Sequence, residues 1–299
     1  MQALGVGTAG AMDVFALRVA NALLGNHDAA PGLELTLGGT EFLASETAWY
    51  ALSGADLGAT LDGGDVPLCA PFRIAAGQRL RLRSARRGQR ACLAVTGGFE
   101  AQHVFGSAAT DLRGGFGGFH GRALQRGDLL RARARRAPIR LPPRVFTSLA
   151  NPAVFPDGPL ALLPGPALSQ LSAEDRERVV HESFTVSRAS DRMGIRLDER
   201  LVSAMLLPQA LSAPVVFGTV QLPPDGRGIV LCADRQTTGG YPVVGVVAST
   251  DHGRLAQLRP GETIRFRMID VEEACAAWRE RERQLARVRV AAATWWQEG

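Results

Sequence analysis

Residues 218–247 read "GTVQLPPDGRGIVLCADRQTTGGYPVVGVV", and this stretch indicates the fold class. Its apolar run from Gly228 to Ala233 has the length and composition of a buried strand. The segment that follows, Asp234 to Tyr241, is rich in hydrogen-bonding groups. Each buried polar group left without a partner costs roughly 1 to 3 kcal/mol. Two interpretations stay open: the turn pairs its polar groups internally, or it binds a ligand.

Short apolar runs separated by turns also fill the first half of the chain. Between Leu33 and Arg133, glycine or proline interrupts them about every ten residues. The runs are LELTLGG, WYALSG, RLRLRS and ACLAVTGG. Such spacing is typical of a β-sandwich or barrel, so we predict a mainly β protein with a few helices.

Three segments have helical signals. Apolar residues recur at helical spacing from Met12 to Leu24 and stop at a Gly-Asn pair. A second helix is predicted from about Ala173, with Ser172 as its N-cap. A third, from Asp270 to about Val290, is rich in Ala, Glu and Arg and is predicted to pack on the outside.

The length of 299 residues is typical of about two domains. Six prolines between residues 136 and 159 predict a linker. On either side of it, an apolar strand leads to Thr-Gly-Gly, then to a Thr-Asp turn and a Gly-acid turn, although glycine-rich turns also resemble one another by chance. We predict two related β domains, over residues 1–145 and 146–299, the second carrying the C-terminal helix.

The chain contains no lysine, so its net charge of +5 comes from arginine. A Walker-type phosphate loop, a Schiff-base amine and a biotinylation site each need a lysine and are therefore excluded. Few aromatic residues accompany the arginine-rich runs, whereas single-stranded nucleic-acid sites need both. We expect no nucleic-acid partner.

The four cysteines are far apart in the sequence, and the five histidines have no metal-ligand spacing. We predict free thiols and no metal site. The sequence shows neither a signal-type N-terminal segment nor an apolar stretch long enough to cross a bilayer. These features predict a cytoplasmic protein without membrane contact.

Two glycine-rich segments are candidates for binding an anion. GVGTAG, Gly5 to Gly10, has dinucleotide-binding spacing, but only Met1 to Leu4 precede it, too few for the strand that this motif requires. We reject a dinucleotide site and keep an anion at the helix entry as a hypothesis. Asp13, at the helix start, is either a cap or an active-site acid. The second segment is DLRGGFGGFHGR, residues 111–122, which contains Arg113. Its glycines would let the backbone approach a carboxylate or phosphate closely. The alternative is a surface loop that binds nothing.

Several long blocks carry a more specific signal. In chain order they are GAMDVFALRVANALLGN, GGFEAQHVFGSAATDLRGGFGGFHGRALQRGD, SDRMGIRL, VQLPPDGRGIVLCADRQTTGGYPVVG and LAQLRPGETIRF. Over nearly the whole chain they resemble the biotin-dependent carboxyltransferase or allophanate hydrolase subunit 2 family. The resemblance implies two cyclophilin-like β-barrel domains and a place in an ATP-dependent 5-oxoprolinase. The A and B subunits of that enzyme are the implied partners, and the reaction opens 5-oxoproline to glutamate.

The substrates of these relatives suggest roles for the polar turn, because 5-oxoproline, urea and biotin each present an N–H group beside a carbonyl. A matching site needs an acceptor, assigned to Asp234, and donors to the carbonyl or its oxyanion. The donors assigned are Gln236, Thr237, Thr238 and the amides of Gly239 and Gly240.

The resemblance also suggests groups around the substrate. Arg192 or Arg113 is expected to hold a carboxylate or phosphoryl group bidentately. Tyr241 is expected to wall the pocket, and the further candidates for substrate binding are Asp13 and Gln221.

The family resemblance leaves two alternatives to the 5-oxoprolinase component. One is a biotin-dependent carboxyltransferase that acts on urea or a related amide, and the other is a regulatory protein that antagonises a kinase inhibitor. Because the chain has no lysine, it carries no covalent biotin. ATP is expected to be consumed by the complex.

Overall fold

The structure is a computed structural model that describes residues 2–133, 158–202 and 211–297. They form two compact units. The N unit contains residues 13–133 and 280–297, and the C unit contains residues 2–12, 158–202 and 211–279. The N-terminal segment, residues 2–12, therefore belongs to the C unit, and the C-terminal segment, residues 280–297, belongs to the N unit. The predicted boundary between residues 145 and 146 lies outside the described residues.

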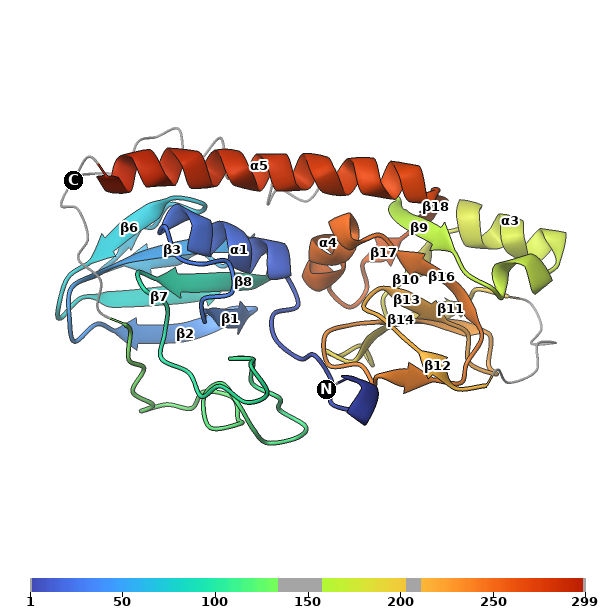
Figure 1. Cartoon of the computed structure of the whole chain (residues 1–299), viewed down its shortest axis with the longest axis horizontal. Helices are drawn as coiled ribbons and strands as arrows, with labels where there is room; N and C mark the ends of the chain where they lie inside the picture. Colours follow the sequence, from blue (N-terminus) through green and yellow to red (C-terminus); the bar gives the residue numbers. More distant parts are fainter. Residues whose placement is uncertain (1, 134–157, 203–210, 298–299) are drawn as a thin grey trace. The chain divides into compact units, whose positions relative to one another are not determined.

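The N unit is built on two four-stranded antiparallel sheets, which Figure 1 draws in blue to green. Their orders are β1-β8-β3-β6 and β2-β7-β4-β5. The strands are β1 (Leu33–Thr36), β2 (Gly38–Leu43), β3 (Ala48–Asp56), β4 (Ala59–Leu61), β5 (Gly64–Asp65), β6 (Pro71–Ile74), β7 (Arg79–Ser84) and β8 (Arg87–Val95). In β7, Leu80 and Leu82 are buried, while the arginines that alternate with them are exposed. Because side chains alternate along a strand with a period of two residues, one face of β7 lies against the core, as the run RLRLRS predicts.

Helix α1 (Val14–Leu23) covers β3 and β8 of the N unit. It begins where the Ala16 N–H donates to Asp13 Oδ1 at 2.9 Å, and Gly25 follows its end with φ of 63°. This confirms the helix predicted from Met12 to Leu24. The later turns of α5 (Val271–Gln297) pack on α1 and β3 through a shared core. That core includes Val19, Leu23, Trp49, Leu285, Val288 and Trp295.

The C unit is built on a six-stranded sheet with the order β11-β14-β13-β16-β9-β18. Only the β9–β18 pairing in this sheet is parallel. The other sheets of the described C unit are the pairs β10-β17 and β12-β15. The strands are β9 (Leu160–Pro164), β10 (Phe184–Thr185), β11 (Gly194–Arg200), β12 (Ala213–Pro214), β13 (Thr219–Gln221), β14 (Arg227–Leu231), β15 (Thr238–Gly239), β16 (Val243–Val247), β17 (Thr263–Ile264) and β18 (Phe266–Met268).

Short helices complete the C unit. They are η1 (Gln2–Leu4), η3 (Leu168–Gln170), α3 (Ala173–His181), η4 (Ser249–Asp251) and α4 (His252–Gln257). The predicted cap of α3 is confirmed, because the Asp175 N–H donates to Ser172 Oγ at 3.0 Å.

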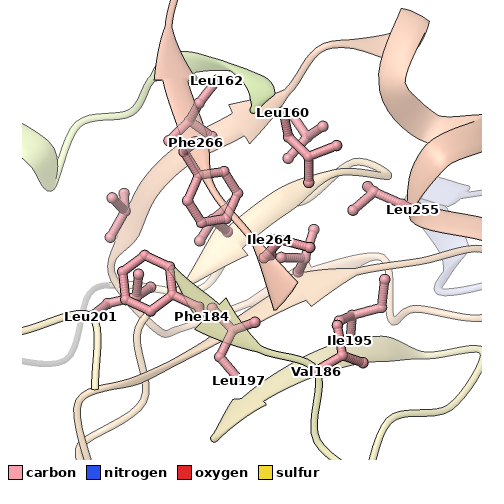
Figure 2. Close-up of a cluster of buried hydrophobic side chains, with 14 of the residues drawn as sticks. Leu160, Leu162, Phe184, Val186, Ile195, Leu197, Leu201, Leu255, Ile264 and Phe266 are labelled. Carbon is pink, nitrogen blue, oxygen red and sulfur yellow. The ribbon is translucent and has the colours of Figure 1, made fainter. Parts of the chain in front are cut away.

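One apolar cluster forms the core of the C unit (Figure 2). Phe184 from β10 and Phe266 from β18 lie with their ring centroids 6.1 Å apart. Leu160 and Leu162 of β9 and Ile195 of β11 belong to the same cluster. The strand predicted from Gly228 to Ala233 appears as β14, and its Val230 is fully buried there.

The prediction of a mainly β protein with a few helices is confirmed, and both units consist of curled sheets. The four cysteines form no disulfide, and burial raises the pKa of the Cys69 thiol to about 12. Along the described chain, no helix has both the length and the apolar character needed to cross a membrane.

Candidate functional site

The polar turn after β14 lies against the segment that leads into β11. The Cys232 N–H donates to the Met193 carbonyl at 2.8 Å, and the Asp234 N–H donates to the Arg192 carbonyl at 2.9 Å. Asp191 Oδ1 in turn accepts from the Met193 and Gly194 amides. The blocks SDRMGIRL and DRQTTGGY, distant in sequence, therefore form one structural site in the C unit.

Arg192 and Asp234 pair with each other in this site. Arg192 Nε lies 2.9 Å from Asp234 Oδ2, and Arg192 Nη2 lies 3.0 Å from Asp234 Oδ1 and 2.5 Å from the Gly10 carbonyl oxygen. The side chains are 25% and 12% exposed. The guanidinium fork proposed to hold a substrate carboxylate is thus already bound to a carboxylate. Each oxygen of Asp234 retains a second lone pair that can accept from a ligand.

Gln221 lies at the end of β13 and is only 1% exposed. Its Nε2 has no hydrogen-bond partner within the described residues. The amide faces the backbone of β15, because a Cβ built on Gly239 would lie 2.3 Å from Nε2. A buried donor without a partner is uncommon in folded proteins and marks a position where a ligand can accept.

The other predicted residues of the polar turn lie in β15 or next to it in the chain. Gln236 and Thr238 are exposed, as is Tyr241 at 37%. The Thr237 carbonyl accepts from the Val215 N–H at 3.0 Å. Gly240 follows β15 and is half-buried. Within the described residues the Asp234 carboxylate bonds to Arg192 and not to the threonines, so the turn is not a closed network of its own side chains.

Sequence reasoning did not single out Arg235 or Thr8, although both belong to this site. Arg235 is only 8% exposed, and its NH1 donates to Thr8 Oγ1 and to the Cys232 carbonyl, both at 3.2 Å. A Cβ built on Gly7 would lie 3.4 Å from the Arg235 carbonyl oxygen. The glycine-rich segment from Gly5 to Gly10 therefore lies against the polar turn. The sequence signals were that Arg235 directly follows Asp234 and that Thr8 lies within the glycine-rich segment.

The two other predicted site residues belong to the N unit. Asp13 is 1% exposed and caps α1. Arg113 is exposed, in a loop where its N–H donates to Asp111 Oδ1 at 3.0 Å. Further along that loop, the bidentate hydrogen bond from Arg122 lowers the pKa of Asp128 to about 2. Side-chain and backbone contacts thus organise the glycine-rich loop.

Comparison with known proteins identifies relatives over nearly the whole chain. Residues 4–268 match the family described as carboxyltransferase domain, subdomain A and B. The chain is 36% identical over 280 residues to the 5-oxoprolinase C subunit of Escherichia coli (strain K12), covering 93% of this chain and 88% of that protein. It is 30% identical over 291 residues to a putative urea carboxylase of Emericella nidulans, covering 92% of this chain and 23% of that protein.

The fold also matches a solved structure. The crystal structure of the K. lactis urea amidolyase superimposes with a TM-score of 0.84 at 24% identity, covering 95% of this chain and 18% of that chain. The present chain thus corresponds to a small part of both urea-related proteins and to most of the bacterial 5-oxoprolinase component.

Proposed function

Because the chain belongs to the carboxyltransferase-domain family of subdomains A and B, we propose that it is the C subunit of an ATP-dependent 5-oxoprolinase. Its similarity to a 5-oxoprolinase C subunit over most of both chains supports this proposal. The chain works with the A and B subunits, and the complex consumes ATP while it opens the lactam of 5-oxoproline to glutamate. This chain carries no biotin, because it has no lysine to which biotin could be attached.

The observation that carries the proposal is the buried, unpartnered amide of Gln221 beside Gly239. A lactam carbonyl satisfies this donor, and the donor then stabilises the oxyanion that forms when the carbonyl is attacked. The lactam N–H needs an acceptor, and Asp234 supplies one through its remaining lone pairs.

Arg192 acts on the substrate through Asp234. Its bidentate contact fixes the direction of the carboxylate, which is what a preorganised acceptor requires. Further donors at the same turn are Gln236, Thr237, Thr238 and the amides of Gly239 and Gly240, with Tyr241 beside them. Substrate contacts of Asp13 and Arg113, which lie in the N unit, stay predictions.

The test is reconstitution of the chain with the A and B subunits, followed by an assay of ADP and glutamate release from 5-oxoproline. Gln221→Met keeps the volume of the side chain and removes its donor. Since one oxyanion donor is worth about 10²–10³ in kcat, we expect a loss of that order. Gln170→Met, at an exposed glutamine of the same unit, is the matched control and should retain full activity.

Two results would contradict the proposal: a wild-type complex that releases no glutamate, or a Gln221→Met complex as active as the control. A second candidate is a carboxyltransferase that acts on urea, which the similarity to a putative urea carboxylase favours. Consumption of urea and carboxylated biotin in place of 5-oxoproline would establish that second function.

A further inference from the structure

Arg235 is a buried cation with few partners. Its side chain uses NH1 for the Thr8 hydroxyl and the Cys232 carbonyl, while its Nε is buried and makes no hydrogen bond within the described residues. No carboxylate of the described chain forms an ion pair with it. The adjacent acid, Asp234, directs both oxygens to Arg192 instead.

A buried guanidinium without an anion is unfavourable, because it loses hydration and gains no opposite charge in return. Burial accordingly lowers the pKa of Arg235. If Arg235 had only a structural role, an apolar side chain of similar volume would give a more stable fold. Cations held in this way are typical of functional sites, where a ligand supplies the missing charge.

The Thr8 hydroxyl lies at the same guanidinium. It accepts from Arg235 Nη1 at 3.2 Å and donates to the Ala233 carbonyl at 3.5 Å, a long contact that it can exchange for a stronger acceptor on a ligand. The amide N–H groups of Gly7 and Ala9 make no hydrogen bond within the described residues. The backbone of Arg235 thus lies against this glycine-rich segment, and the Thr8 hydroxyl of the segment contacts the Arg235 guanidinium.

We propose that Arg235, together with the Thr8 hydroxyl, binds the carboxylate of a small organic ligand. The identity of that ligand rests on the proposed function: 5-oxoproline carries a carboxylate, whereas urea carries none. This assignment replaces Arg192, whose fork is bound to Asp234, as the residue that recognises the acid group of the substrate.

The experiment is ligand titration of the purified full chain, followed by ¹⁵N NMR of the arginine Nε–H groups and by calorimetry. The Arg235 signal is assigned from its absence in the spectrum of Arg235→Lys. The three probes are 5-oxoproline, 2-pyrrolidinone, which is the same lactam without the carboxylate, and acetate. Arg196→Gln, at an exposed arginine of the same unit, is the matched control for Arg235→Gln.

We expect 5-oxoproline to shift the Arg235 signal saturably and to bind at least about tenfold more tightly than 2-pyrrolidinone, the value of one charge-assisted contact. Arg235→Gln should remove this preference, Arg235→Lys should keep part of it, and the control should keep all of it. Arg235→Gln should also melt no lower than wild type, because it removes an unpaired buried charge.

Equal binding of 5-oxoproline and 2-pyrrolidinone to the wild type would overturn the role of Arg235 and leave the proposed function intact. A shift of the Arg235 signal by acetate alone would support the carboxylate site and contradict the proposed substrate. If no probe shifts that signal or binds, the role of Arg235 fails, while glutamate release by the reconstituted complex decides the proposed function separately.

Discussion

Replacement of Asp234 by asparagine tests how much the pair with Arg192 stabilises the C unit. The substitution preserves the shape of the side chain and removes its charge. Asparagine offers Arg192 one acceptor, while its NH2 group faces a guanidinium that can only donate. The bidentate contact seen at 2.9 and 3.0 Å is therefore lost.

The exposure of the pair sets the magnitude. Breaking a fully buried ion pair costs about 3–5 kcal/mol, and an exposed pair contributes roughly 0.2–1 kcal/mol. With side chains 25% and 12% exposed, the Arg192–Asp234 pair lies between these limits, so we expect a loss of about 2 kcal/mol. For a unit of this size that loss lowers Tm by about 4–8 °C.

Differential scanning calorimetry of the full chain measures this shift. Glu273→Gln is the control, because Glu273 pairs with Arg267 at side-chain exposures of 48% and 51%, and its loss should cost little. The double variant Arg192→Gln/Asp234→Asn should cost less than the sum of the single changes, since the two residues interact. A Tm for Asp234→Asn that matches the control would refute the reasoning.

Two further predictions concern one residue in each unit. Gly239→Ala places a methyl group 2.3 Å from the Gln221 amide and should lower the free energy of unfolding by about 1–3 kcal/mol. Urea unfolding measures this loss. The loss should be smaller when Gly239→Ala is introduced together with Gln221→Ala. In the N unit, the hydrogen bond from Arg18 lowers the pKa of Glu282. The pair therefore stabilises the fold fully above the unfolded pKa of a glutamate, about 4.3. This stabilisation is lost as the pH falls through the lower pKa of Glu282 in the folded protein. Glu282→Gln should therefore be less stable than wild type at pH 7. The two proteins should become equally stable once the pH has fallen below the folded pKa of Glu282. Urea unfolding across pH measures this difference, and an undiminished gap in acid would disprove the linkage.

Local features of the fold were predictable because they depend on residues close in sequence. The cap of α1 joins Asp13 to Ala16, and the cap of α3 joins Ser172 to Asp175. The alternation in RLRLRS likewise depends on neighbouring side chains, which point to opposite faces of a strand. A spacing of two to four residues is fixed by backbone geometry alone.

The blocks that form the candidate site were also visible in the sequence, including the polar turn after β14 and the segment around Arg192. The way these blocks contact one another was not visible in the sequence. The sequence offers Arg192 or Arg113 to hold a carboxylate or phosphoryl group, and the fold brings Arg192 to Asp234 and to the carbonyl of Gly10. The contact between Arg235 and Thr8 could not be predicted, because the two residues are 227 positions apart in the sequence.

The amino-acid sequence by itself thus determined the β-rich class, the cap of α3 and the family, because each follows from short-range patterns or from ordered blocks. Only the tertiary structure decided which charges neutralise one another and which remain for a ligand. The physical reason is distance along the chain: the partners of Arg192 and Arg235 come from separate segments, and only packing of the C unit core brings them within hydrogen-bond reach.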